Sequence, residues 1–332
     1  MTHPSSNRRA LLCAAASTAA LFALAPAHAQ APYPNKPIRL VVPFQAGGAT
    51  DVLARVLGQK MSASMGQPLV VDNKPGAAGI IGTDAVAKAA PDGYTIVLSL
   101  SNSLMTNEFL YEKLPYDTQR DLTLVYQIAM APLVLVVHPS VPAKTGPELL
   151  KYVAANKGKV AYGSYGVGAY PHLAGAHMSL TQQADMNHVA YKGEAPMVQD
   201  LIGGQIQMAY ASALAAKPHI DAGKLKAVGV TGERRMSTLP NVPTLAEQGL
   251  KDEAYRVTGW LAIAAPAKTP KAIVDRIADE VRKATQQPDV RERVAAMGFE
   301  IKDSSPELFA AAWKQERPVW ERLIKQSGAK LE

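Results

Sequence analysis

The segment IRLVVPFQAGGAT, residues 38–50, indicates the fold class of this chain. Residues 38–44 form a short apolar run of the kind found in buried strands, and residues 45–50 supply a turn with two adjacent glycines. After the turn, apolar side chains recur at helical spacing from Val52 to Met61. The segment therefore predicts a strand, a turn and a helix, which together form the repeating unit of α/β folds.

The same alternation continues along the chain. A strand is expected at residues 68–72, followed by a glycine turn at 76–79, a helix to about residue 89 and a buried strand at 94–100. Further strands are expected at residues 133–137, 160–163, 206–211 and 227–231, with helices at 146–155 and around 197–201. This order predicts an α/β fold with several parallel strands beneath helices.

Two similar segments bear on the domain plan. Residues 132–137 lead into PAKTGP at 142–147, and residues 260–265 lead into PAKTP at 266–270. A chain that crosses twice between two similar lobes would place such a strand at each crossing, although chance similarity between two short turns is the alternative. We predict one lobe from residues 30–130 and 257–332, and a second from residues 131–256.

The amino terminus has the pattern of a secretory signal peptide at residues 1–29. Arg8 and Arg9 precede an apolar stretch at residues 10–25, which ends in the small-x-small pattern Ala27-His28-Ala29. A membrane-spanning helix is the alternative, but it needs about 20 strongly apolar residues, and this stretch is alanine-rich and interrupted by a serine and a threonine. The arginine pair also permits a twin-arginine signal, although the general secretory route is favoured. We expect export to the periplasm.

Composition excludes several classes of protein. The 332 residues are 48% hydrophobic and 19% charged, which argues against disorder, collagen and coiled coil. The net charge of +7 is dispersed, and no block of Lys and Arg resembles a nucleic-acid-binding arm. The single cysteine, Cys13, lies in the predicted signal. The exported protein is therefore expected to have no disulfide, thiolate metal site or cysteine nucleophile.

Familiar catalytic and cofactor signatures fail in this sequence. Residues 162–166 resemble a hydrolase nucleophile elbow around Ser164, but Tyr162 stands where that motif needs glycine. Gly166 and Gly168 begin a dinucleotide fingerprint, but its third glycine position is Pro171.

Metal and acid–base signatures are equally weak. His172 and His177 are five residues apart and so do not share one helix face, as a zinc pair would. Asp51 and Asp72 are candidates for acid–base work, but Asp51 follows a glycine turn, where an acid that caps a helix is the ordinary explanation. We therefore expect no catalytic residue, metal or cofactor, and we expect that the protein is not an enzyme.

Three glycine-rich loops each lead from a strand end to a helix start. They contain Gly47-Gly48, Gly76-Ala77-Ala78-Gly79 and the segment from Gly163 to Gly168. Such loops expose backbone N–H groups at helix N-termini, where carboxylate or phosphate binds favourably. Three of them in two candidate lobes predict a shared cleft for an anion.

The chain resembles the Bug family, the extracytoplasmic receptors of tripartite tricarboxylate transporters. The resemblance rests on YPNKPI at 33–38 with PFQAGG at 43–48 and Asp51, NKPGAAG at 73–79, YGS at 162–164 through Gly168 to HLA at 172–174, and VAYKG at 189–193 through LIGG at 201–204. PTLAEQG at 243–249 and AAP at 264–266 extend it over nearly the whole exported chain. Two departures are Ala176 and Ala211, where family members often have glutamate and aspartate, so polar contacts are not carried over to those two positions.

The resemblance implies a two-lobed periplasmic binding protein, or Venus flytrap, fold that closes on a small carboxylate and delivers it to the membrane subunits of a transporter. It implies ligand contacts at Phe44, Gly47, Gly48, Thr50, Asp51, Ser101, Asn102, Ser164, Gly166, Gly168 and Tyr191. His172 is expected to be a buried structural histidine. We expect a monomer that binds no nucleic acid.

The ligand is expected to be an aromatic mono- or dicarboxylate, similar to terephthalate. Phe44, Tyr165, Tyr170 and Tyr191 lie near the predicted cleft and could flank a flat ring. A small aliphatic acid is the alternative ligand. A periplasmic sensor for a two-component system and a hydrolytic enzyme acting on a small acid are the alternative functions.

Overall fold

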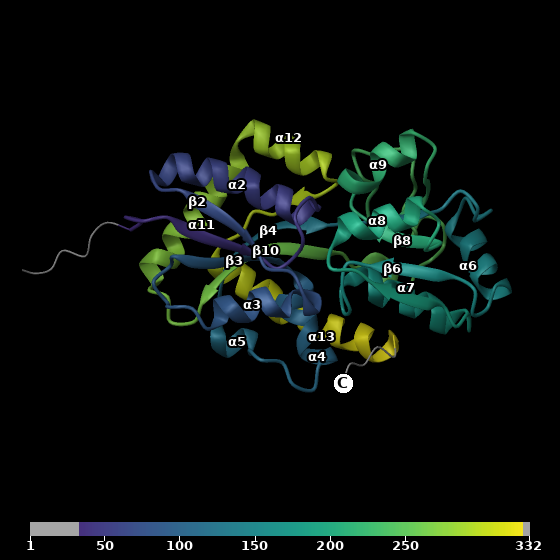
Figure 1. Cartoon of the computed structure of the whole chain (residues 1–332), viewed down its shortest axis with the longest axis horizontal. Coiled ribbons are helices and arrows are strands. Elements are labelled where there is room, and N and C mark those ends of the chain that lie inside the picture. Colours follow the sequence, from purple (N-terminus) through teal and green to yellow (C-terminus); the bar gives the residue numbers. More distant parts are fainter. Residues whose placement is uncertain (1–32, 328–332) are drawn as a thin grey trace, which may run out of the picture. The chain divides into compact units, whose positions relative to one another are not determined.

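The strands of this protein form two separate sheets, each with helices on both faces (Figure 1). The computed structural model describes residues 33–327, so the predicted signal peptide and Cys13 lie outside the described residues. Lys36–Glu332 form one compact unit, which holds both sheets.

The first sheet has six strands in the order β11-β4-β10-β3-β1-β2. They are β1 (Ile38–Val42), β2 (Leu69–Asn73), β3 (Thr95–Leu100), β4 (Leu122–Ala131), β10 (Gly259–Pro266) and β11 (Glu300–Ile301). β1 pairs in parallel with β2 and β3, whereas β10 runs antiparallel to β3 and β4. β10 is buried along its whole length, because helices cover both faces of the sheet.

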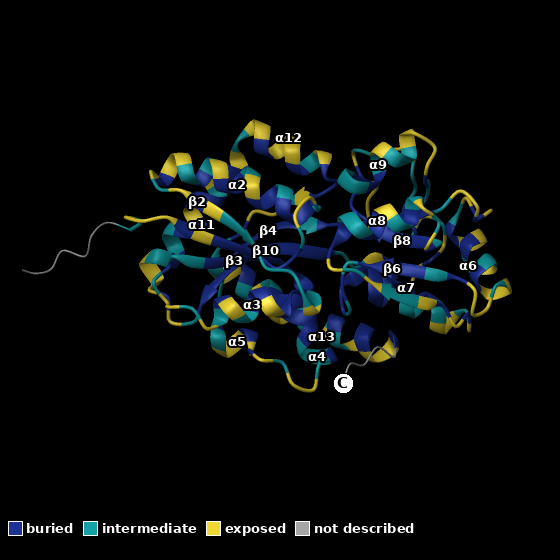
Figure 2. Ribbon diagram, viewed as in Figure 1, coloured by how far each residue is buried: buried dark blue, intermediate teal, exposed yellow. Residues whose placement is uncertain are grey.

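Helices surround this sheet, with α2 and α12 on one side and α3 and α13 on the other (Figure 1). They are α2 (Ala49–Met65), α3 (Ile80–Ala87), α4 (Asn107–Leu110), α5 (Thr118–Asp121), α11 (Lys271–Gln286), α12 (Pro288–Ala296) and α13 (Pro306–Ser327), with a 3-10 turn η1 (Ala77–Gly79) and a π-helical turn η2 (Asn102–Thr106). In α11, the helically spaced Val274, Ile277 and Val281 are buried, as their spacing predicts. Figure 2 shows the strands buried and the outer helix surfaces exposed.

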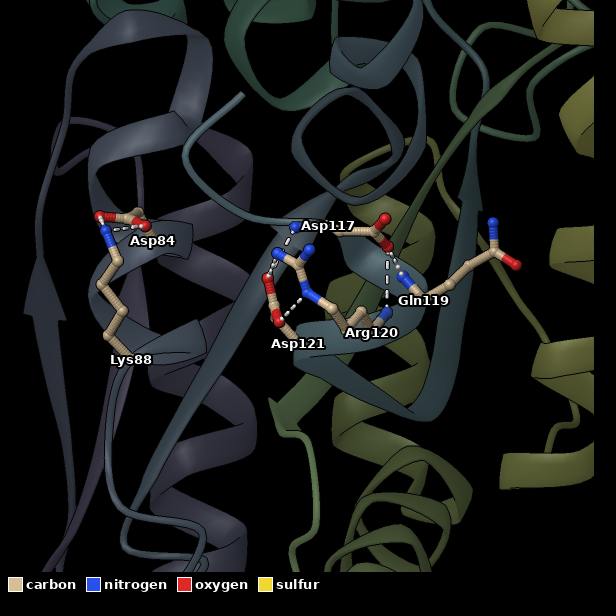
Figure 3. Close-up of polar contacts among 6 residues, drawn as sticks. All are labelled: Asp84, Lys88, Asp117, Gln119, Arg120 and Asp121. Atoms are coloured by element: carbon tan, nitrogen blue, oxygen red, sulfur yellow. Dashed lines mark hydrogen bonds and ion pairs between the residues drawn. The ribbon is translucent and has the colours of Figure 1, made fainter. Parts of the chain in front are cut away.

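Local side chains hold the amino-terminal end of the short helix α5 (Figure 3). The Asp117 carboxylate accepts hydrogen bonds from the backbone N–H groups of Gln119 and Arg120 at 2.9 and 3.0 Å. The Arg120 guanidinium donates to both carboxylate oxygens of Asp121. This N-cap turns the chain into β4.

The second sheet has five strands in the order β7-β6-β8-β5-β9. They are β5 (Val134–Val137), β6 (Ala161–Ser164), β7 (Asn187–Ala190), β8 (Met208–Ala211) and β9 (Lys226–Val230). Its helices are α6 (Gly146–Ala155), α7 (Tyr170–Thr181), α8 (Glu194–Ile202), α9 (Ala213–Asp221) and α10 (Glu253–Arg256). β6 pairs in parallel with β7 and β8, and β5 runs antiparallel to β8 and β9.

The two sheets share one strand order. β2-β1-β3-β10-β4 in the first sheet corresponds to β7-β6-β8-β5-β9 in the second. The two similar segments of the sequence are β10 and β5, and each is the antiparallel strand next to a parallel set. The two-sheet α/β class is as predicted, with the addition that both sheets are mixed. The lobe boundaries proposed from the sequence stay a prediction.

Helix α13 contacts elements that belong to both sheets. Near its start, the Trp313 indole N–H donates to the carbonyl oxygen of Leu104 at 2.9 Å. Near its end, Trp320 packs edge-to-face against Tyr170 of α7, with ring centroids 6.1 Å apart. Over residues 33–327, no helix is long and apolar enough to cross a membrane.

Candidate functional site

A pocket lies between the loops at the ends of the two sheets. The space inside it that a water-sized sphere can occupy is about 30 Å³, so the pocket is narrow in this structure. Its walls include the last residues of β3 and β4 and residues after β1 from the first sheet, and residues after β6, β7 and β8 from the second. They are Phe44, Gln45, Gly48, Ala49, Thr50, Leu100, Ala131, Leu133, Tyr165, Glu194, Ser212 and Phe299.

Three helices begin at this pocket. The N-caps of α2, α8 and α9 are Gly48, Gly193 and Ser212, and the lining includes Ala49, Glu194 and Ser212 at those starts. The first N–H groups of a helix have no intrahelical partner and carry partial positive charge. The polar end of the pocket therefore favours negative charge.

The carboxylate of Glu194 accepts hydrogen bonds from groups at two of these helix starts. One carboxylate oxygen accepts from the Ser212 N–H at 2.6 Å, and the other accepts from the Ser212 hydroxyl at 2.9 Å and from the Ala49 N–H at 3.3 Å. The residue is only 8% exposed. Burial raises the pKa of Glu194, and the hydrogen bonds from Ser212 and Ala49 offset that rise only in part.

The same carboxylate connects the two halves of the pocket. Ala49 opens α2 beside the first sheet, whereas Glu194 and Ser212 belong to the second. A backbone hydrogen bond from the Gln45 N–H to the Lys192 carbonyl at 3.3 Å also crosses between the two sets of loops. The loops after β1 and β7 are thus joined directly.

Asp51 lies in the first turn of α2 but does not line the pocket. Its carboxylate accepts hydrogen bonds from the Gly47 N–H, the Arg55 guanidinium and the Asn73 side-chain amide, all at 3.0 Å. Burial opposes ionisation, but the bonds from Arg55, Gly47 and Asn73 outweigh it and hold the pKa of Asp51 below its usual value. Asp51 therefore anchors the loop after β1, which is the structural role that the glycine turn suggests.

The glycine loop after β6 is held by two neutral histidines. The Ser164 hydroxyl is fully buried, bonds the Gly166 carbonyl at 2.9 Å and lies 2.7 Å from Nε2 of His188. The Gly168 N–H donates to Nδ1 of His172 at 3.0 Å. The two imidazoles stack with centroids 3.9 Å apart. Burial lowers the pKa of His172 to about 4, and burial together with the neighbouring His172 lowers that of His188 to about 3.

Gly166 and Gly168 pack against the first-sheet side of the molecule. A Cβ atom at Gly166 would lie 3.1 Å from the Ala78 Cα, and one at Gly168 would lie 2.2 Å from a Leu110 methyl carbon. The φ of Gly168 is +76°, a conformation that favours glycine. Close approach to the Ala78 backbone therefore explains Gly166, and the positive φ explains Gly168.

Asn102 lies at the same contact, because its side-chain amide donates to the Ala78 carbonyl at 2.7 Å. Ser101 is buried beside Gly259, where a Cβ atom on the glycine would lie 3.2 Å from the serine hydroxyl oxygen. The Tyr191 hydroxyl donates to Asp200 at 2.8 Å. These side chains hold the loops around the pocket.

The residues predicted as ligand contacts thus fall into two groups. Phe44, Gly48 and Thr50 line the pocket. Those outside its lining are Gly47, Asp51, Ser101, Asn102, Ser164, Gly166, Gly168 and Tyr191. Among the predicted aromatic walls, Tyr165 lines the pocket, whereas Tyr170 is buried and its hydroxyl donates to the Ala254 carbonyl.

Four lining residues carry no clear signal in the sequence: Gln45, Glu194, Ser212 and Phe299. An acid at the start of a helix, such as Glu194, is usually a partner for the helix dipole. Ser212 follows Ala211, where the departure from the family pattern offers the only hint. Within residues 33–327, no group of three or more His, Cys, Asp or Glu side chains is placed to hold a metal ion.

Comparisons with known proteins agree with this architecture. Residues 53–329 match the family model described as "Tripartite tricarboxylate transporter family receptor". The chain is 40% identical over 293 residues to the UPF0065 protein in the tcbD–tcbE intergenic region of Pseudomonas sp. strain P51, covering 88% of this chain and 86% of the relative.

Two solved structures have the same fold. The periplasmic binding protein BugD is 34% identical with a TM-score of 0.85, and a protein of R. palustris solved with adipate is 32% identical with a TM-score of 0.85. Each alignment covers 90% of this chain and 100% of the solved chain. This chain belongs to the family of tripartite tricarboxylate transporter receptors.

Proposed function

We propose that this protein is a periplasmic receptor that captures a small carboxylate in the pocket between its two sheets. The observation that carries the proposal is a pocket lined from both sheets, with three helix N-termini at its polar end. Family membership and the R. palustris relative solved with adipate support a carboxylate ligand.

The lining suggests how such a ligand is held. Thr50 lies in the first turn of α2 and lines the pocket, so its hydroxyl can donate to a ligand carboxylate there, whereas the Ala49 N–H already donates to Glu194. Phe44, Tyr165 and Phe299 give the pocket aromatic walls, and the first two rings meet edge-to-face with centroids 6.4 Å apart. Aromatic walls favour a flat apolar body, so the proposed ligand is a carboxylic acid with an aromatic ring.

Binding also explains how the receptor would signal to a membrane partner. A ligand that contacts residues from both sheets favours the arrangement in which both sets of contacts form. The membrane subunits of the transporter would then recognise that arrangement and accept the ligand. We propose a monomeric receptor without catalytic function.

Calorimetric titration of the purified protein with terephthalate, benzoate and adipate tests the proposal. We expect saturable binding, and Thr50→Ala should weaken it by roughly 2- to 100-fold, the loss expected for one hydrogen bond to a charged group. The exposed Ser237 provides the matched control, and Ser237→Ala should leave binding unchanged. Absence of binding to every acid would overturn the proposed function.

A further inference from the structure

Glu194 differs from the other buried carboxylates of the described residues. Asp51, Glu194 and Glu280 are the three acidic side chains buried within residues 33–327. Asp51 lies 3.0 Å from Arg55, and Glu280 lies 2.9 Å from Lys283. Over the same residues, no Lys, Arg or His nitrogen lies within 4.0 Å of the Glu194 carboxylate. It is the buried acid that lacks a cation.

The pocket itself supplies no cation either. Glu194 is the one charged residue among those that line it, and the rest are apolar or neutral polar side chains. A buried carboxylate is strongly disfavoured unless a cation or several hydrogen-bond donors compensate it. Backbone and hydroxyl donors of Ser212 and Ala49 compensate Glu194 in part.

Its hydrogen-bonding capacity is not exhausted. An ionised carboxylate offers about four acceptor positions, and the donors of Ser212 and Ala49 use three. Because Glu194 lines the pocket, a ligand donor can use the remaining capacity. A second ligand carboxylate placed there would instead lie beside another carboxylate, and two neighbouring carboxylates cannot both ionise without a cost in free energy.

We propose that Glu194 selects a ligand that carries an ammonium group as well as a carboxylate, so that this receptor prefers amino-carboxylates to plain dicarboxylates. The inference rests on the proposed function, because the carboxylate of the ligand is taken to bind at the start of α2. The ammonium group donates to Glu194 and supplies the missing cation. Glu194 is thereby a specificity-determining residue.

Matched ligands that differ only in their end groups test the inference. The aromatic series is terephthalate, 4-(aminomethyl)benzoate and 1,4-bis(aminomethyl)benzene, and the aliphatic series is adipate, 6-aminohexanoate and 1,6-diaminohexane. Dissociation constants are measured by calorimetry for the purified wild type, for Glu194→Gln and for Glu292→Gln. Glu292 is an exposed acid on α12 and serves as the charge-matched control.

We expect the wild type to bind the amino-carboxylate of at least one series at least 10-fold more tightly than the matching diacid. Glu194→Gln should reduce or reverse that ratio by at least 10-fold, while Glu292→Gln should retain it. A ratio between two ligands is insensitive to a partly unfolded fraction, so a loss of folded protein cannot imitate this result.

The opposite outcomes separate the inference from the proposed function. If the wild type binds the diacids as tightly as the amino-carboxylates, or if Glu194→Gln weakens both equally, the inference is overturned and the carboxylate receptor stands. If the diamines bind and no carboxylate does, the carboxylate function and the preference for amino-carboxylates are both overturned. If no compound binds, both the proposed function and the inference are overturned.

Discussion

Two carboxylates stand at the start of helix α2 and behave in opposite ways. Asp51 comes from the helix itself, is paired with Arg55 and has a lowered pKa. Glu194 comes from α8 of the second sheet, has only hydrogen-bond donors of Ser212 and Ala49 around it, and has a raised pKa. The first is compensated by a cation within the fold, whereas the second lines the pocket without one.

The comparison shows how burial alone fails to identify a functional acid. Asp51 and Glu194 are both almost fully buried and both lie at helix starts. What separates them is the presence of a cation and of empty space next to the carboxylate. An acid that is compensated locally holds a loop in place, and an acid that is compensated incompletely beside a pocket is available to a ligand.

The largest expected effect comes from breaking the compensated acid. Asp51→Asn removes the charge that Arg55 neutralises and weakens the bonds to the Gly47 N–H and Asn73, so we expect a loss of roughly 2–3 kcal/mol in the free energy of unfolding. Glu194→Gln should change it by less than about 1 kcal/mol, because it removes a charge whose burial is costly. Urea unfolding of both variants at neutral pH measures the difference, and equal losses would contradict the distinction.

Lowering the pH should destabilise the protein at the glycine loop after β6, because the two histidines that hold this loop are neutral in the folded state. The folded protein keeps His172 unprotonated until pH about 4, whereas the unfolded chain protonates it near 6.5. A histidine with a lowered folded pKa loses stability as pH falls between these values, by about 1.4 kcal/mol per unit, or about 2 kcal/mol at pH 5. Unfolding curves from pH 8 to 5 measure this slope.

The control for the acid effect is His172→Gln, which cannot protonate. Its stability should depend on pH less steeply than that of the wild type over the same range, whatever its absolute stability. Asp51 does not affect this slope. A carboxyl whose pKa is lowered in the folded protein loses its contribution to stability only as the pH falls below the ordinary pKa of 3.8. An unchanged slope in the variant would show that other groups cause the acid sensitivity.

The smallest expected effect is at an exposed ion pair. Arg120 and Asp121 form a close pair at 2.7 Å on the surface (Figure 3), and the bond from Arg120 lowers the pKa of Asp121 to about 2. Solvent and salt screen such pairs, so Arg120→Ala should leave the urea midpoint of unfolding unchanged within error. A clear decrease in the urea midpoint would mean that a short ion-pair distance stabilises the protein even when the pair is exposed. The contrast with the buried Asp51 would then have no physical basis.

Much of the fold could be predicted from periodicity. The apolar runs at residues 38–44, 94–100 and 133–137 correspond to β1, β3 and β5, and the helix expected at 146–155 is α6. Strands β4, β7 and β11 were not predicted. β7 has only exposed or half-buried residues, and β11 has two residues, so neither produces a buried strand pattern.

Part of the pocket lining could be expected from the sequence, whereas ligand contact at the predicted residues stays a prediction. Residues next to a glycine turn, such as Phe44, Gly48 and Thr50, could be found because turn chemistry is local. Glu194 and Ser212 could not, because their role depends on which helix starts face one another across the pocket.

The sequence by itself determined the α/β class and the similar strands at residues 132–137 and 260–265, because apolar periodicity and glycine turns report on neighbours within a few residues, and its motifs indicated the family. Only the tertiary structure decided that Ala49 and Glu194, 145 residues apart, share a hydrogen bond at a pocket with no cation in its lining. Whether a charge is neutralised depends on every group within a few ångströms, and chain folding chooses those groups from distant parts of the sequence.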